Sequence, residues 1–370
     1  MNTKKLVCCW DLEGPISIID FAAELGKNLN KKLGLNLLEY DMAEFFTMIS
    51  NYDDYIIDVT GVKEQLNIPE YQPGDTLRLM APLYASCYTD EELINKARSN
   101  MGLLPGCKEL MKILHKDWDI FVISTSYTHF AHNVTKALEI PRDHVYCTDF
   151  NIKNLKKGIT NIEEAINVLI KKIFKKYLTN GKDLNSIIED LNEFFWLGSE
   201  SDYIKIMNKV IVRGGRRKEL AVEEISKRTG ISISEMIALG DSITDINMLH
   251  RLNDEGSTAI SFNGNKFSVK QANVALTTPN SLGALPIFQE FKDLDNFLEV
   301  WELNFLKFEN DPNNIPNDLI SNQCKELFLK YNFIPEIINL KNKSNEQIKA
   351  IILRQEKMRK FMRGWASDLG

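Results

Sequence analysis

Two short acidic fragments constrain the fold of this chain more than any other feature. Residues 7–10 form an apolar run that leads into Asp11-Leu12-Glu13-Gly14, and residues 236–239 form another that leads into Gly240-Asp241. Apolar runs of this length without alternation are typical of parallel strands that are buried on both faces. Ligands of open α/β sheets bind at the carboxyl ends of such strands. We therefore expect an α/β fold in which these acids meet at one edge of the sheet.

Two further fragments complete the pattern. A third apolar run, residues 120–123, ends in Ser124 and Thr125, and Lys218 lies 23 residues before Asp241. Carboxylate oxygens are the ligands that Mg²⁺ prefers, and an ammonium group and a hydroxyl can hold phosphoryl oxygens. One such fragment alone is usually a turn between a strand and a helix, but four in this order indicate a site. The sequence predicts Mg²⁺-assisted phosphoryl transfer.

The order and spacing resemble the haloacid dehalogenase (HAD) superfamily, and within it the phosphoserine-phosphatase-like branch. The similarity covers the first strand, residues 105–149 and residues 212 to about 280. It implies a Rossmann-like core with a parallel sheet flanked by helices, and a carboxylate nucleophile that forms an aspartyl-phosphate. The roles that the resemblance implies are nucleophile for Asp11, acid–base for Glu13, phosphate binding for Ser124 and Lys218, and Mg²⁺ binding for Asp11, the backbone carbonyl of Glu13, Asp241 and Asp245.

Glu13 departs from the family pattern, which usually has aspartate at this position. The extra methylene keeps the acid but moves it. General acid–base catalysis contributes about 10²–10⁴-fold, and a displacement of about 1 Å can cost about 10²-fold. Low turnover is therefore compatible with this sequence.

Ser124 and Thr125 compete for the place that faces the phosphate. We expect the strand to end at Ser124 and a helix to open with Thr125-Ser126-Tyr127, which favours Ser124. Thr125 stays a candidate for substrate binding.

The chain divides into a HAD core (residues 1–18, 100–150 and 211–290), a helical cap (19–99), a helical insertion (151–210) and a C-terminal helical extension (291–370). Segments of this length between strands are too long to be simple connections. In the family such a cap closes over the site and selects the substrate. The resemblance places Asp20 at the substrate amino group, although an acid at a helix N-terminus explains it equally well, and Arg78 is a candidate basic partner.

The segment of residues 166–178, INVLIKKIFKKYL, has an apolar stripe opposite lysines. Packing against the core is favoured over a partner helix or a membrane surface. Three arginines lie close to Lys218 in the sequence. They either add to the positive field around a phosphate or are solvated on the surface; they are Arg213, Arg216 and Arg217. In the extension, Ser344 and Gln347 form a capping box, but no chemistry is indicated there.

Composition argues against several classes of protein. The chain has 370 residues, 44% of them hydrophobic, and a net charge of −6, which argues against a nucleic-acid binder. No apolar run approaches the ~18 residues of a membrane span, and no signal peptide is evident, so a cytoplasmic location is expected. The six cysteines lack CxxC spacing and are expected to be reduced. For His129 and His132, an exposed helix face is favoured over a metal site.

Two functions remain open. The leading one is a Mg²⁺-dependent phosphatase that hydrolyses a small phosphorylated metabolite. The alternative is a weakly active or non-catalytic accessory subunit that uses its insertion or C-terminal helices for protein contacts. The DLEGP start at residues 11–15, the SFNGNKFSVKQANVAL stretch at residues 261–276 and the extended carboxyl end are also similar to an archaeal group of HAD proteins known as subunit R of the energy-converting hydrogenase A. This resemblance implies association with a hydrogenase complex.

Overall fold

The computed structural model describes residues 5–36 and 39–368. Its centre is a seven-stranded sheet in the order β3-β2-β1-β4-β5-β6-β7, in which all neighbouring strands are parallel except β6 and β7. The predicted α/β class with a Rossmann-like core is confirmed. The strands are β1 (Leu6–Trp10), β2 (Trp118–Tyr127), β3 (Val145–Thr148), β4 (Met236–Gly240), β5 (Thr258–Phe262), β6 (Val274–Thr277) and β7 (Glu336–Asn339).

Helices cover both faces of the sheet, as the uninterrupted apolar strands predict. Val7 and Cys9 of β1 face one layer, and Cys8 and Trp10 face the other. The first layer contains α14 (Arg216–Thr229) and α15 (Ile246–Asp254). The second contains α7 (Cys107–Leu114), α8 (Thr128–Ala137) and α17 (Leu285–Gln289), where Phe288 stacks on Trp10 with ring centroids 5.6 Å apart.

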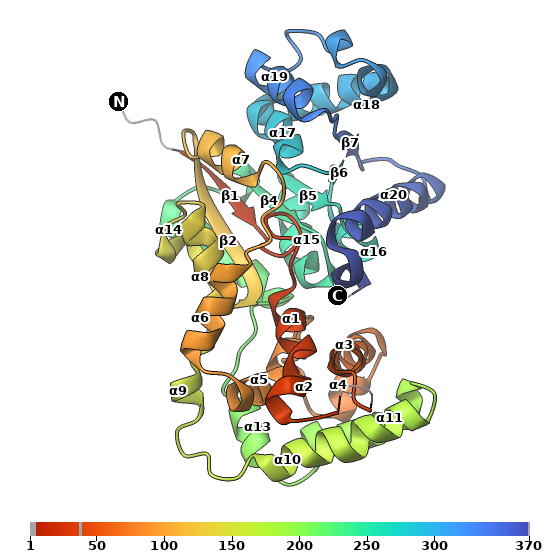
Figure 1. Ribbon diagram of the computed structural model, residues 1–370. Coiled ribbons are helices and arrows are strands. Elements are labelled where there is room, and N and C mark those ends of the chain that lie inside the picture. The colour runs from red at the N-terminus through yellow and green to blue at the C-terminus, as the bar shows by residue number, and fades with distance from the viewer. Residues whose placement is uncertain (1–4, 37–38, 369–370) are drawn as a thin grey trace.

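The chain between β1 and α7 forms a group of helices beyond the carboxyl ends of the strands (Figure 1). Asp20 and Asp41 begin two of them as N-caps, each accepting a hydrogen bond from a first-turn backbone N–H. We refer to this group of helices as the cap. They are α1 (Phe21–Lys27), α2 (Leu29–Leu33), α3 (Met42–Asp58), α4 (Val62–Gln65), α5 (Thr76–Cys87) and α6 (Asp90–Ser99).

The insertion packs through its apolar stripe, but onto the cap rather than onto the sheet. Phe174 meets Phe45 of α3 edge to face, with ring centroids 5.2 Å apart, and the Tyr52 hydroxyl donates to Asn192 Oδ1 at 2.6 Å. The insertion therefore enlarges the cap (Figure 1). Its helices are α9 (Ile152–Leu155), α10 (Glu163–Asn167), α11 (Lys175–Thr179), α12 (Ile188–Asn192) and α13 (Asp202–Met207), with a π-helical segment (Val168–Phe174) joining α10 to α11.

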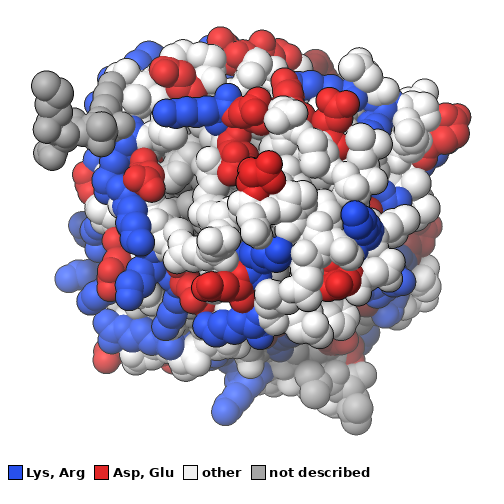
Figure 2. Space-filling model, turned by 90° about the horizontal axis from the view of Figure 1, so that it is seen from above, with Lys and Arg blue, Asp and Glu red and all other residues white. Residues whose placement is uncertain are grey.

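The C-terminal extension contains α18 (Leu294–Asn310), α19 (Asn322–Tyr331) and α20 (Asn345–Arg363). The expectation of helices alone is wrong here, because residues 336–339 form β7 and pair with β6. The predicted capping box of Ser344 and Gln347 begins α20. Figure 2 shows charged side chains of both signs interspersed over one face of the molecule. In the described part of the chain, no helix combines the length and the apolar character needed to cross a bilayer.

His129 corrects a second expectation. It is not on an exposed face: only 8% of it is exposed, and its Nε2 lies 2.8 Å from Asp90 Oδ1. This contact ties α8 to the end of the cap at α6. All six cysteines are free.

Candidate active site

The strand register brings the first two acids together. Trp10 of β1 pairs with Leu239 of β4, and the N–H of Asp11 donates to the carbonyl of Leu239 at 2.9 Å. Asp11 and Asp241 therefore leave the sheet side by side, and both are buried. Gly14 has a φ of +118°, and a Cβ there would lie 2.2 Å from Asp241 Oδ2. The turn after β1 requires glycine for this reason.

A buried lysine links the acids. Lys218, in the first turn of α14, places its Nζ 2.8 Å from Asp11 Oδ1 and 2.7 Å from Asp245 Oδ1. The other oxygen of Asp245 accepts hydrogen bonds from the N–H groups of Asp241 at 2.9 Å and Ser242 at 3.1 Å. Asp245 thus holds Lys218 with one oxygen and the turn after β4 with the other.

The acids suit a hard divalent cation. One ligand atom from each of Asp11, Asp241 and Asp245 lies within 4.8 Å of the others. Asp241 Oδ1 is buried and has no hydrogen-bond partner among the described residues. An orphaned buried carboxylate oxygen is costly unless a cation or a donor satisfies it. Three carboxylates with such an oxygen fit Mg²⁺.

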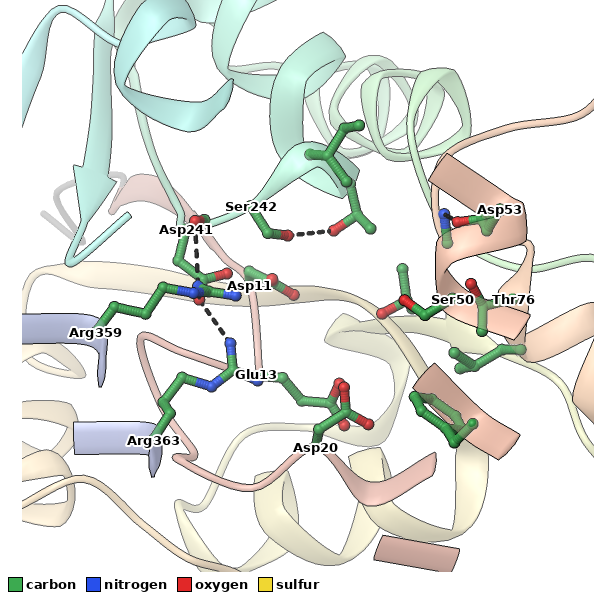
Figure 3. A pocket seen from close by; sticks show the side chains of 16 residues that line it. Asp11, Glu13, Asp20, Ser50, Asp53, Thr76, Asp241, Ser242, Arg359 and Arg363 are labelled. Carbon is green, nitrogen blue, oxygen red and sulfur yellow. Dashed lines mark hydrogen bonds and ion pairs between the residues drawn. The ribbon is translucent and has the colours of Figure 1, made fainter. Parts of the chain in front are cut away.

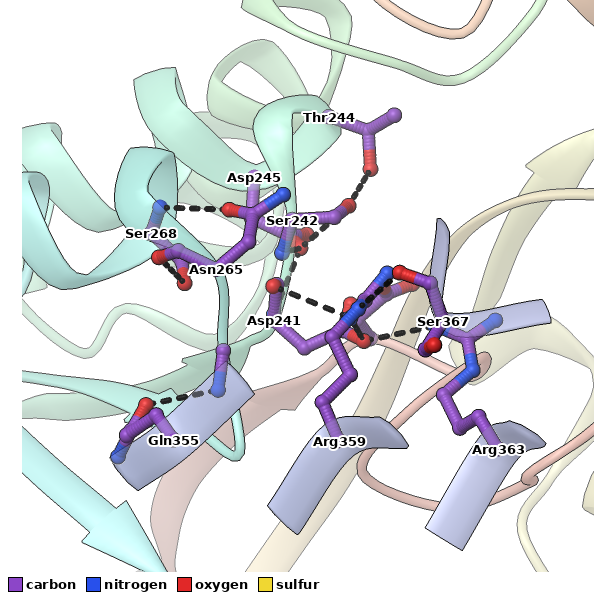
Figure 4. Close-up of polar contacts among 12 residues, drawn as sticks. Asp241, Ser242, Thr244, Asp245, Asn265, Ser268, Gln355, Arg359, Arg363 and Ser367 are labelled. Carbon is purple, nitrogen blue, oxygen red and sulfur yellow. Dashed lines mark hydrogen bonds and ion pairs between the residues drawn. The ribbon is translucent and has the colours of Figure 1, made fainter. Parts of the chain in front are cut away.

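The other oxygen of Asp241 meets two arginines that the sequence analysis missed. Arg363 Nη1 lies 2.8 Å from Asp241 Oδ2, and Arg359 Nη1 forms an ion pair with the same oxygen and lies 3.3 Å from the backbone carbonyl of Asp241 (Figure 4). Both guanidinium groups come from α20, so the extension does contribute to the site. A signal was present: Ile351, Gln355, Arg359 and Arg363 recur every four residues along one helix face.

Glu13 and Asp20 lie together at the mouth of the site (Figure 3). Glu13 Oε1 accepts a hydrogen bond from the N–H of Phe21 at 3.1 Å, and Asp20 Oδ1 accepts one from Ala23 at 2.9 Å. Both carboxylates are thus held by the N-terminus of α1, where negative charge is favoured. Asp20 caps α1, as expected of an acid at a helix N-terminus, and it also lines the pocket.

Burial and mutual repulsion perturb the titration of this cluster. Burial, followed by the charge of Asp245, raises the pKa of Asp11 to about 8, against the lowering effect of Lys218. Burial and Asp20 raise the pKa of Glu13 to about 8. Burial alone would lower the pKa of Lys218, but Asp11 and Asp245 outweigh it and raise that pKa. Lys218 therefore stays positively charged. The neighbouring positive charge does not compensate for the burial and mutual repulsion of Asp11 and Glu13, so their pKa values stay raised.

Thr125, and not Ser124, lines the pocket. The expected strand end is wrong: β2 continues to Tyr127, with a register shift against β3 between Ile123 and Tyr127. Ser124 is fully buried, and its Oγ accepts a hydrogen bond from the N–H of Ser126 at 3.0 Å. The irregular end of β2 turns the threonine toward the cavity.

The cap contributes residues that motif reasoning did not find. Phe46, Ser50 and Asp53 of α3 line the pocket together with Thr76 of α5 (Figure 3). Their spacing along α3 places the first three on one helix face. The sequence did contain a sign of this: Ser50 and Asp53 are polar residues on the otherwise apolar, buried face of α3.

Two basic candidates lie elsewhere. Arg78 does not line the pocket: its Nε donates to the carbonyl of Met207 at 3.3 Å, and its Nη2 donates to Asn208 Oδ1 at 2.7 Å. Arg217 is not a solvated neighbour of the site, because its Nη1 lies 2.7 Å from the fully buried Asp75 Oδ1. Arg217 joins the start of α14 to the cap.

The fold and the site define an α/β protein with a buried lysine and strand-end acids suited to a divalent cation. Residues 105–254 match the family model of haloacid dehalogenase-like hydrolases. The match agrees with the resemblance to the HAD superfamily that the motifs indicate, and it supports a hydrolase.

One solved structure shares this fold along its whole length. A gene product from Archaeoglobus fulgidus is similar with a TM-score of 0.71 and 22% identity, over 99% of each chain. A phospho-aspartyl intermediate analogue of phosphoserine phosphatase is similar with a TM-score of 0.43 and 13% identity, over 76% of this chain and 98% of that one. A substrate-bound phosphoserine phosphatase complex has the same TM-score and identity, over 77% and 98%. No curated protein matches the chain by sequence.

Proposed function

We propose that this protein is a Mg²⁺-dependent phosphatase that hydrolyses a small phosphorylated metabolite through an aspartyl-phosphate on Asp11. The observation that carries the proposal is the buried contact of Lys218 with Asp11 and Asp245, beside the orphaned oxygen of Asp241. A carboxylate nucleophile splits phosphoester hydrolysis into two displacements. Asp11, Asp241 and Asp245 would hold Mg²⁺, which supplies neutralising charge for an anionic substrate when bound.

Each protein group has a defined part in the two steps. Asp11 attacks phosphorus while the ester oxygen leaves and takes the proton of Glu13. Glu13, now a carboxylate, accepts a proton from water, whose oxygen attacks phosphorus and releases phosphate and Asp11. Lys218 and the Thr125 hydroxyl are the candidates for holding the phosphoryl oxygens.

The environment of Glu13 suits its first role. Burial raises the pKa of Glu13, which is the direction that favours a general acid. The N–H of Phe21 at the start of α1 holds its carboxyl group. Asp20 lies beside it and would meet a cationic group of the substrate.

The alternative, a weakly active or regulatory HAD-fold subunit, is favoured by one observation. Arg359 and Arg363 hold Asp241, a proposed Mg²⁺ ligand, by ion pairs. Association with a hydrogenase complex would belong to this alternative.

A screen of phosphorylated metabolites with Mg²⁺, read as release of inorganic phosphate, separates the two functions. We expect hydrolysis of at least one substrate by the natural protein and none by Asp11→Asn, since an amide is a poor nucleophile of nearly the same shape. Asp254→Asn, on the exposed end of α15, is the matched control and should retain full activity. Phosphate release by Asp11→Asn would show that another group attacks, and no release by any protein would favour the regulatory alternative.

A further inference from the structure

The C-terminal helix is anchored to the core by a buried polar stripe. Gln355 is fully buried; its Oε1 accepts hydrogen bonds from Ser261 Oγ at 2.9 Å and from the N–H of Gly264 at 2.7 Å, and its Nε2 donates to the carbonyl of Ser261 at 3.0 Å. Ile351, one turn earlier, packs with Val269 and Ile338. One and two turns later, the same face presents Arg359 and Arg363. This stripe directs α20 at Asp241.

The two arginines place positive charge on a carboxylate of the candidate metal site. Only 3% of the side chain of Arg359 and 6% of that of Arg363 is exposed, and both reach the same carboxylate oxygen. The charge of Arg363 also interacts with Asp20, Glu13 and Asp11. A guanidinium group is easily desolvated and carries positive charge into such a cluster. Lys218 contributes a further positive charge next to Asp11 and Asp245.

We infer that α20 is a built-in competitor of Mg²⁺: Arg359 and Arg363 neutralise Asp241 in the metal-free protein, and Mg²⁺ binding and docking of the arginines exclude each other. The inference rests on the proposed function, because it assumes that Asp241 is a Mg²⁺ ligand. Mg²⁺ requires near-octahedral oxygen ligands at close range. Two fixed cations on the same carboxylate oppose it both by charge and by occupying Oδ2.

The turn that follows α20, residues 364–368, which we call the tail, also contacts the cap. Arg359 Nε donates to the carbonyl of Ser367 at 3.1 Å, which holds the turn that follows α20. In that turn Trp365 lies under the ammonium group of Lys27 of α1, with Nζ 3.8 Å from the ring centroid. Release of the arginines would therefore loosen a contact between the tail and the helix that positions Glu13 and Asp20. Metal binding would in this way weaken a contact between the C-terminal turn and α1.

Calorimetric titration of the full chain with Mg²⁺ tests the competition directly. Arg363→Gln, in the last turn of α20, should bind Mg²⁺ at least about tenfold more tightly than the natural protein, because a close positive charge is removed. Arg359→Gln should change the affinity in the same direction. Lys360→Gln is the matched control: it removes one charge from the adjacent, exposed position and should leave the affinity within about twofold. Equal or weaker Mg²⁺ binding by both arginine variants would overturn the inference and make the arginines supports of the metal ligand.

Hydrogen exchange of the natural protein supplies a readout that does not depend on any variant. Addition of Mg²⁺ should increase amide exchange in residues 359–368 while exchange in β1 and β4 stays unchanged. Unchanged or reduced exchange in the tail would overturn the inference. The outcomes are distinguishable from failure of the proposed function: Mg²⁺-dependent phosphate release with unaltered affinity of the arginine variants refutes competition alone, whereas no Mg²⁺ binding by any variant refutes both.

Discussion

Asp53 offers a prediction whose size follows from the structure. It lies on the pocket face of α3, only 4% exposed, and its Oδ2 accepts a hydrogen bond from the N–H of Gly74 at 3.1 Å, while Oδ1 has no partner among the described residues. Burial, with the charges of Asp75 and Asp54, raises its pKa from 3.8 to about 7. The folded state therefore binds this proton more tightly than the unfolded state does.

The sign of the pH dependence follows from linkage. Because the pKa is raised on folding, the protonated side chain stabilises the fold at low pH, and this contribution is lost as the pH rises from about 4 through about 7. At about 1.4 kcal/mol for each pH unit, the loss approaches 4 kcal/mol above pH 7, of which about 3 kcal/mol develops between pH 5 and pH 8. Asparagine does not titrate, so the stability of the Asp53→Asn variant does not include this pH-dependent loss.

Urea unfolding at pH 5 and pH 8 measures the effect. The free energy of unfolding of Asp53→Asn, relative to the natural protein, should increase by about 3 kcal/mol between the two pH values. Any constant effect of the amide on packing cancels in this comparison. Asp58→Asn, the same substitution at an exposed position of α3, should show no such increase. A relative stability of Asp53→Asn that is the same at both pH values would refute the argument that Asp53 is buried as an acid.

Three further substitutions test the site. Gly14→Ala places a Cβ 2.2 Å from Asp241 Oδ2 at a φ of +118°; the backbone strain alone costs about 1–3 kcal/mol, and urea unfolding that detects no loss would contradict the close packing. Glu13→Gln should lower turnover on an active substrate by about 10²–10⁴-fold without abolishing beryllofluoride binding, and unchanged turnover would remove Glu13 from the acid–base role. Asp241→Asn should weaken Mg²⁺ binding in calorimetry and also release α20, since a buried ion pair that loses one partner costs about 3–5 kcal/mol; retention of both affinity and stability would exclude the carboxylate from both roles.

The tail complicates the usual test of a metal ligand. In a HAD core alone, loss of Mg²⁺ binding by Asp241→Asn would identify a ligand. Here the same carboxylate also neutralises Arg359 and Arg363, so the substitution leaves two buried cations unpaired. The arginine variants separate these effects because they keep Asp241.

The sequence was sufficient to predict the core of the site. Residues 7–10 and 236–239 read as strands because they are apolar without alternation, and parallel strands have only one carboxyl edge at which Asp11 and Asp241 can emerge. Lys218 was found by its residue type and its distance along the chain from Asp241. These predictions depend on short stretches of sequence, and on the parallel sheet that several unbroken apolar runs indicate.

The contacts that complete the site were decided by tertiary structure. Thr125 faces the pocket because β2 continues past Ser124 with a shifted register, which no propensity at these residues indicates. Asp53 lines the pocket only because the insertion and α5 pack α3 over the sheet edge. Arg359 lies 118 residues from Asp241, and its spacing with Gln355 marks a buried face but not what that face meets. Local sequence fixes which side of a helix is buried, whereas the position of α20 depends on its packing against β6 and α16, a long-range arrangement that only the folded chain specifies.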